Sequence, residues 1–221
     1  MGIQVKICGI NSLEAADAAV RGGAEFAGLN FHAGSPRFLK LELARALADR
    51  MRGRARLVAL LSDPSDDAVA DAVRWVRPDL VQLHGTEPPE RVAAIRSRFA
   101  VEIVKAFAIS EASDFSRVRI YEPVADRLLF DAKAPQGASR PGGHGNAFDW
   151  QLLGGRTFSR PWFLAGGLTP ENVALAIATS GAPGVDVSSG VETSPGTKST
   201  TLIADFIANA KATQFASKAR A

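Results

Sequence analysis

Cysteine is almost absent from this chain: Cys8 is the one cysteine among 221 residues. A lone cysteine cannot form an intrachain disulfide, so a disulfide-stabilised scaffold is excluded. Free thiols are typical of reducing compartments, and we therefore expect a cytoplasmic protein. The thiol itself is either a small buried hydrophobe or a reactive group.

Long apolar runs are absent as well. No stretch approaches the roughly 18 to 20 residues that a helix needs to cross a bilayer. The N-terminus lacks a basic segment followed by an apolar core, so we expect neither a signal peptide nor a membrane partner. Apolar residues still make up 46% of the chain, which is enough for a full core.

A strong charge of one sign is also missing, since 26 basic and 23 acidic residues leave a formal net charge of +3. Basic residues gather only at 50–56, without interleaved aromatics. We interpret that run as a solvated helix end and expect no nucleic-acid partner. The three histidines have no ligand-like spacing, so we expect no zinc site.

Short apolar runs alternate with amphipathic stretches, as expected for parallel strands buried on both faces and joined by helices. Eight such units and no internal linker predict one (βα)8 barrel domain over 1–221 rather than a doubly wound sheet. We expect strands at 4–8, 26–31, 56–61, 80–83, 101–107, 127–131, 162–165 and 184–187. We expect helices at 12–21, 39–51, 66–76, 88–98, 110–121 and 200–211, and a further helix that opens at 169–171.

One connection, 132–148, is unusually long and contains four glycines and two prolines. Loops of this length without secondary structure are uncommon and often functional. We interpret it as a candidate lid, with a surface insertion as the alternative.

The active site of such a barrel lies at the carboxyl ends of its strands. Cys8 ends the first predicted strand, and a following helix N-terminus would lower the thiol pKa toward neutrality. Asp131 ends the sixth strand. A thiol base and a carboxylic acid at one barrel mouth would form an acid–base isomerase. A cysteine in an apolar run is more often inert core, and its place at the strand end favours the reactive group; core packing stays the alternative for Cys8. A loop cap or a pair with Lys133 stays the alternative for Asp131.

Two small-residue loops follow the last two predicted strands. Gly166 and Gly167 follow the seventh, and Ser188, Ser189 and Gly190 follow the eighth. Glycines let the backbone approach an anion, and serines add hydroxyl donors. Because barrels often hold phosphate between these loops, we predict a phosphate site, with two ligand-free turns as the alternative.

Two further side chains are expected near the mouth. Arg37 suits bidentate recognition of a carboxylate, although a surface salt bridge fits its position as well. His84 either lines the pocket or is a satisfied hydrogen-bonding residue.

Seven motifs follow one another along nearly the whole chain: VKICGI at 5–10, SPRF at 35–38, VQLHG at 81–85, LLFDA at 128–132, GGHGNAFDW at 142–150, LAGGLTPENV at 164–173 and GVDVSSGVETSPGTKS at 184–199. In order and spacing they resemble the phosphoribosylanthranilate isomerase family of tryptophan biosynthesis. One departure is His144, which stands where the family usually has threonine or serine. Another is 61–63, where a valine–asparagine pair is more common.

The resemblance implies an Amadori rearrangement of N-(5′-phosphoribosyl)anthranilate to 1-(2-carboxyphenylamino)-1-deoxyribulose 5-phosphate. Asp131 would protonate the furanose ring oxygen, Cys8 would remove the C2 proton, and Arg37 would meet the anthranilate carboxylate. The two small-residue loops would bind the phosphate. A Schiff-base nitrogen accepts the electrons, so no metal or organic cofactor is implied. The family leaves both a monomer and a homodimer open.

Three other functions are less compatible with these residues. The related histidine-pathway isomerase uses two aspartates, whereas the first strand here ends in Cys8. Indoleglycerol-phosphate synthase relies on strand-end lysines, and Lys6 precedes the strand end. A non-catalytic phosphosugar-binding barrel could lose Cys8 or Asp131, and both are present.

Overall fold

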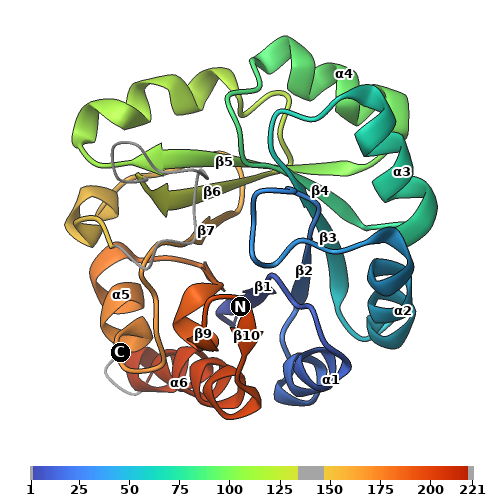
Figure 1. Ribbon diagram of the computed structural model, residues 1–221. Coiled ribbons are helices and arrows are strands. Elements are labelled where there is room, and N and C mark those ends of the chain that lie inside the picture. Colours follow the sequence, from blue (N-terminus) through green and yellow to red (C-terminus); the bar gives the residue numbers. More distant parts are fainter. Residues whose placement is uncertain (1, 134–146, 219–221) are drawn as a thin grey trace.

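The computed structural model describes residues 2–133 and 147–218. Eight parallel strands form a closed barrel, in which each strand pairs with its neighbours in sequence and β1 pairs with β8 (Figure 1). The predicted (βα)8 barrel is confirmed. The strands are β1 (Gln4–Cys8), β2 (Phe26–Asn30), β3 (Arg56–Leu61), β4 (Leu80–Leu83), β5 (Glu102–Ile109), β6 (Arg127–Ala132), β7 (Trp162–Leu164) and β8 (Gly184–Val187).

Helices surround the barrel and cover the outer faces of its strands (Figure 1). The first begins as predicted, because the Ser12 hydroxyl accepts a hydrogen bond from the Ala15 amide and caps the helix. The α-helices are α1 (Leu13–Gly22), α2 (Leu41–Met51), α3 (Asp66–Val76), α4 (Pro89–Phe99), α5 (Val173–Ser180) and α6 (Thr200–Lys218). Shorter 3-10 helices are η1 (Ala112–Ile120), η2 (Trp150–Leu153) and η3 (Ser189–Val191).

Three predicted helices differ from the structure. The last one, predicted at 200–211, continues to Lys218 as α6. The stretch predicted as a helix at 110–121 is the 3-10 helix η1. The helix predicted to open at 169–171 begins only at Val173. The Asn172 side chain explains this delay, since it accepts from the Thr169 amide and donates to the Gly167 carbonyl, which folds the preceding residues into a loop.

The barrel interior has an apolar floor and a polar upper part. Phe26 and Phe163 meet edge to face, and the Arg127 guanidinium lies over both rings. The strand period of two places Lys6 and Cys8 on the same inward face of β1. The apolar residues of the floor thus separate the polar strand ends from the other end of the barrel. These buried residues are Phe26, Val58, Leu80, Val104, Ala106, Leu129, Phe163 and Ala165.

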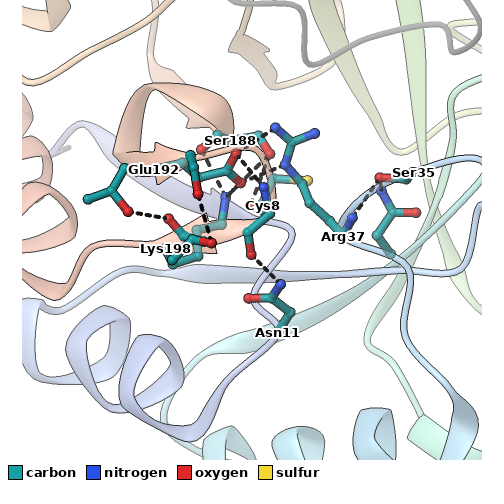
Figure 2. A network of polar contacts seen from close by, with 12 residues as sticks. Cys8, Asn11, Ser35, Arg37, Ser188, Glu192 and Lys198 are labelled. Carbon is teal, nitrogen blue, oxygen red and sulfur yellow. Dashed lines mark hydrogen bonds and ion pairs between the residues drawn. The ribbon is translucent and has the colours of Figure 1, made fainter.

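A short hairpin that the sequence analysis did not predict follows η3. Strands β9 (Glu192–Ser194) and β10 (Thr197–Lys198) pair in antiparallel fashion, with Gly196 at positive φ in the turn. This hairpin lies beside the carboxyl end of β1 (Figures 1 and 2). It places Glu192 and Lys198 next to the strand ends.

Two other predictions concern the lid and the membrane. The candidate lid at 132–148 falls mainly on 134–146, outside the described residues. None of the helices described in 2–133 and 147–218 combines the length and apolar character needed to cross a bilayer.

Candidate active site

Cys8 and Asp131 lie at the carboxyl ends of β1 and β6, on the side of these strands that faces the barrel interior. Cys8 is only 5% exposed and Asp131 only 7%. The structure therefore places the predicted base and acid at one end of the barrel. Asp186 of β8 is also buried there.

Asp131 is held by its own strand end and by His84. Its Oδ1 accepts from the Ala132 amide at 2.8 Å, and its Oδ2 lies 3.2 Å from Nε2 of His84. The other ring nitrogen, Nδ1, lies 2.9 Å from the amide nitrogen of Gln82. With Gln82 in this orientation, its amide nitrogen donates to Nδ1, which leaves Nε2 of His84 as the donor to Asp131. The partner of Asp131 is thus His84, a role that the sequence left undecided.

Cys8 shares the barrel interior with a buried ion pair. Nζ of Lys6 lies 2.9 Å from Oδ1 of Asp186, and the strand register places the two residues side by side. Burial would lower the pKa of Lys6, but Asp186 and the Cys8 thiolate together raise it. Burial raises the pKa of Asp186 against the opposing effect of Lys6.

The predicted lowering of the Cys8 pKa is wrong. Burial raises the pKa of this thiol, and Asp186 adds to the effect, while Lys6 and Lys198 only partly oppose it. The expected helix effect is weak because α1 starts at Leu13, and its positive end acts only within about one turn.

Arg37 forms a buried ion pair rather than a surface salt bridge. Its Nε and Nη2 donate to the two carboxylate oxygens of Glu192 at 2.7 and 2.8 Å. Both side chains are at most 4% exposed. Its stem also requires glycine at position 9, where φ is +72° and an added Cβ would lie 2.5 Å from Cδ of Arg37. Arg37 is therefore fixed next to the end of β1.

Glu192 is the main site residue that the sequence patterns do not reveal. It lies 155 positions from Arg37 in the chain, and no local periodicity links the two. Burial would raise the pKa of Glu192, but hydrogen bonds and charges from Arg37 and Lys198 hold it below its usual value. The Pro195-Gly196 pair is a turn pattern that could have indicated the hairpin.

The two predicted phosphate loops pack against each other. A Cβ on Gly190 would overlap the carbonyl oxygen of Leu168, so the loop after β8 touches the loop after β7 directly. Gly166 packs against Ala132 and Asp131, which connects the same loops to the predicted acid. Ser188 and Ser189 lie at the start of η3.

Ser188 links the loop after β8 to both Cys8 and the hairpin. Its hydroxyl donates to the Cys8 carbonyl at 3.2 Å, and its own carbonyl accepts from Nζ of Lys198 at 2.8 Å. Within the described ranges, no three His, Cys, Asp or Glu side chains come together as a metal site would need.

Residues 5–209 match the family model described as N-(5′-phosphoribosyl)anthranilate isomerase. A relative of that name from Rhodospirillum centenum is 51% identical over 213 residues, which cover 96% of this chain and 100% of the relative.

Solved structures agree with this assignment. Phosphoribosyl anthranilate isomerase from Thermotoga maritima has a TM-score of 0.85 and 37% identity, over 95% of this chain and 99% of that one. It has also been solved as monomers generated from a dimeric form. Another phosphoribosyl anthranilate isomerase, in complex with reduced 1-(o-carboxyphenylamino)-1-deoxyribulose 5-phosphate, has a TM-score of 0.82 and 35% identity, over 95% and 99% of the two chains. By sequence and by fold, this chain belongs to the N-(5′-phosphoribosyl)anthranilate isomerase family.

Proposed function

We propose that this chain isomerises N-(5′-phosphoribosyl)anthranilate to 1-(2-carboxyphenylamino)-1-deoxyribulose 5-phosphate by general acid–base catalysis, with Cys8 as the base and Asp131 as the acid. The observation that carries the proposal is the position of these two groups. Cys8 is the last residue of β1 and Asp131 the last but one of β6, and both lie at the same end of the barrel and face its interior. General acids and bases have to lie within hydrogen-bond reach of the protons they move, and this end of a barrel is where substrates bind.

The reaction divides into two proton transfers. Asp131 gives a proton to the furanose ring oxygen while the bond from this oxygen to C1 breaks, and the anilino nitrogen donates its lone pair to form a C1–N double bond. Cys8 then removes the C2 proton, the C–H electrons form a C1–C2 double bond, and the nitrogen regains its lone pair. Tautomerisation of this enolamine gives the ketone. Atoms and electrons balance without an external oxidant or reductant.

The anionic ends of the substrate fit the positively charged and donor-rich groups beside the acid and base. Arg37 keeps Nη1 outside its two bonds to Glu192, and we assign this nitrogen to the anthranilate carboxylate. The phosphate is assigned to the contacting loops that contain Gly166, Gly167, Ser188, Ser189 and Gly190. Their mutual packing supports this assignment, because it brings backbone groups of both loops to one place.

The remaining proposals concern the whole chain. We assign it one barrel domain over 1–221 and the cytoplasm as its location, because a single free thiol suits a reducing compartment. We expect it to act as a monomer or a homodimer.

Freshly prepared N-(5′-phosphoribosyl)anthranilate tests the proposed activity, because its fluorescence is lost as the ring opens and rearranges. Purified protein should remove this fluorescence in proportion to its concentration, without added metal or cofactor. Folded protein that binds the substrate but does not turn it over would contradict the proposal and favour a non-catalytic phosphosugar-binding barrel.

A further inference from the structure

Two cations share one carboxylate beside Cys8. Oε1 of Glu192 accepts from Nε of Arg37 at 2.7 Å and from Nζ of Lys198 at 2.8 Å. Oε2 accepts from Nη2 of Arg37 at 2.8 Å and from the Gly196 amide at 3.1 Å. The three charged side chains are at most 4% exposed. Burial lowers the pKa of Lys198, and the Glu192 carboxylate opposes this effect. With Lys198 protonated, the buried triad of Arg37, Glu192 and Lys198 carries one positive charge in excess.

The triad is fastened to the end of β1 from two sides (Figure 2). Lys198 donates to the Ser188 carbonyl at 2.8 Å, and the Ser188 hydroxyl donates in turn to the Cys8 carbonyl at 3.2 Å. Arg37 packs its stem against Gly9, the residue that follows Cys8. A buried ammonium with several fixed acceptors has little freedom to move away, so its charge stays beside the end of β1 that carries Cys8.

The other charged groups that face this part of the barrel are paired with each other. Lys6 and Asp186 form their own ion pair at 2.9 Å. Asp131 contacts His84 at the end of β6. Lys6 also acts on the Cys8 thiol, but the negative charge of its partner Asp186 opposes this effect. Among the described residues, the positive charge near Cys8 that no carboxylate balances is thus the one that Lys198 adds to the Arg37–Glu192 pair.

We propose that Lys198, oriented by Glu192, is a positioning residue for the base: its ammonium favours the thiolate form of Cys8. The proposal rests on the proposed function, which requires that thiolate. A nearby opposite charge stabilises the charged form of an ionisable group, and does so more strongly in a buried site. Burial raises the pKa of Cys8, and both Lys6 and Lys198 act against this increase.

Alkylation of Cys8 by iodoacetamide tests this role, because the thiolate reacts and the chain has no other cysteine. The rate is measured against pH by mass spectrometry of the intact wild type, Lys198→Met, Lys198→Arg and Glu192→Gln. In Lys198→Met, the Arg37–Glu192 pair remains and no unpaired charge is created. Lys198→Arg keeps the charge and serves as the matched control.

The half-maximal rate of Lys198→Met should shift to higher pH by about one unit, and that of Lys198→Arg should stay close to the wild type. Glu192→Gln removes a negative charge but keeps a side-chain oxygen that can accept from Lys198, which the Ser188 carbonyl also holds, so the midpoint should shift to lower pH. A structural role alone would change the plateau rate but not move the midpoints in opposite directions. An unchanged midpoint in Lys198→Met, or equal shifts in Lys198→Met and Lys198→Arg, would overturn the proposal.

The comparison of the two lysine variants decides the question even if Glu192→Gln does not fold. Alkylation does not depend on turnover, so it also separates this proposal from the proposed function. Absence of turnover in the wild type contradicts the function, whereas unchanged alkylation midpoints contradict the role of Lys198.

Discussion

The thiol of Cys8 has to lose its proton before it can accept one from a substrate, and burial at the end of β1 opposes that loss. The sequence shows Cys8 at a strand end, which is enough to suggest a reactive group. It does not show the enclosure that determines its charge. Asp186 and Lys198 are distant in the chain and approach Cys8 only when the barrel closes. The direction of the pKa shift was therefore predicted wrongly.

The pairing of Arg37 with Glu192 leads to a test of substrate recognition. A guanidinium can bond Glu192 and a substrate carboxylate at the same time, whereas an ammonium has no planar fork. Arg37→Lys should raise KM for N-(5′-phosphoribosyl)anthranilate about tenfold or more. Steady-state kinetics with the aniline analogue, which lacks the carboxylate, provides the control. Equal increases in KM for both compounds would contradict a carboxylate contact.

The buried carboxylate of Glu192 should make the free energy of unfolding depend on pH in the acidic range. Its pKa is lowered in the folded protein, so its contribution is complete above the unfolded carboxyl pKa of about 4.3 and is lost as the pH falls through the lower folded value. Glu192→Gln should lower the free energy of unfolding by about 3 to 5 kcal/mol near neutral pH, because it leaves two buried cations without a counter-charge.

Urea unfolding at several pH values measures the difference in unfolding free energy between the wild type and Glu192→Gln. This difference should shrink in acid, because the protonated carboxyl of the wild type resembles the amide. Glu102→Gln is the control, because its ion pair with Arg56 is exposed and should contribute less than about 1 kcal/mol. A difference for Glu192→Gln that does not change with pH would mean that its charge has no part in stability.

At the scale of elements, the alternation of apolar runs and helices was sufficient to predict all eight barrel strands. Strands of a parallel barrel are buried on both faces, so each appears in the sequence as a compact apolar run. The hairpin of β9 and β10 was missed because strands of three and two residues are too short to show a period. The later start of α5 depends on side-chain hydrogen bonds of Asn172, which no periodicity records.

The contact between the loops after β7 and β8 predicts that a methyl side chain at position 190 weakens phosphate binding. Gly190→Ala would force the loop after β8 away from Leu168. We expect KM and the inhibition constant of inorganic phosphate each to rise about tenfold or more. Gly53→Ala is the control, since nothing lies within 4 Å of its Cβ and its own strained φ affects only stability. Unchanged phosphate inhibition in Gly190→Ala would argue against these loops as the anion site.

At the scale of the whole molecule, the apolar floor of the barrel supports the strand ends that carry the site. Phe163 is fully buried and packs against Phe26 under the Arg127 guanidinium. Phe163→Ala should lower the free energy of unfolding by about 3 to 5 kcal/mol through the lost contacts and the cavity. Denaturant unfolding measures the loss, and Leu175→Ala, at an exposed position, should change stability by less than about 0.5 kcal/mol. Equal effects of the two would contradict a packed floor.

The central claim is that a buried thiol and a carboxylic acid at one barrel mouth carry out an Amadori rearrangement. The most direct measurement is the turnover number of Cys8→Ala and Asp131→Ala with N-(5′-phosphoribosyl)anthranilate, with circular dichroism to confirm that both variants fold. The account predicts that each variant loses at least about a hundredfold in kcat. Turnover close to that of the wild type in either folded variant would contradict the role assigned to that residue.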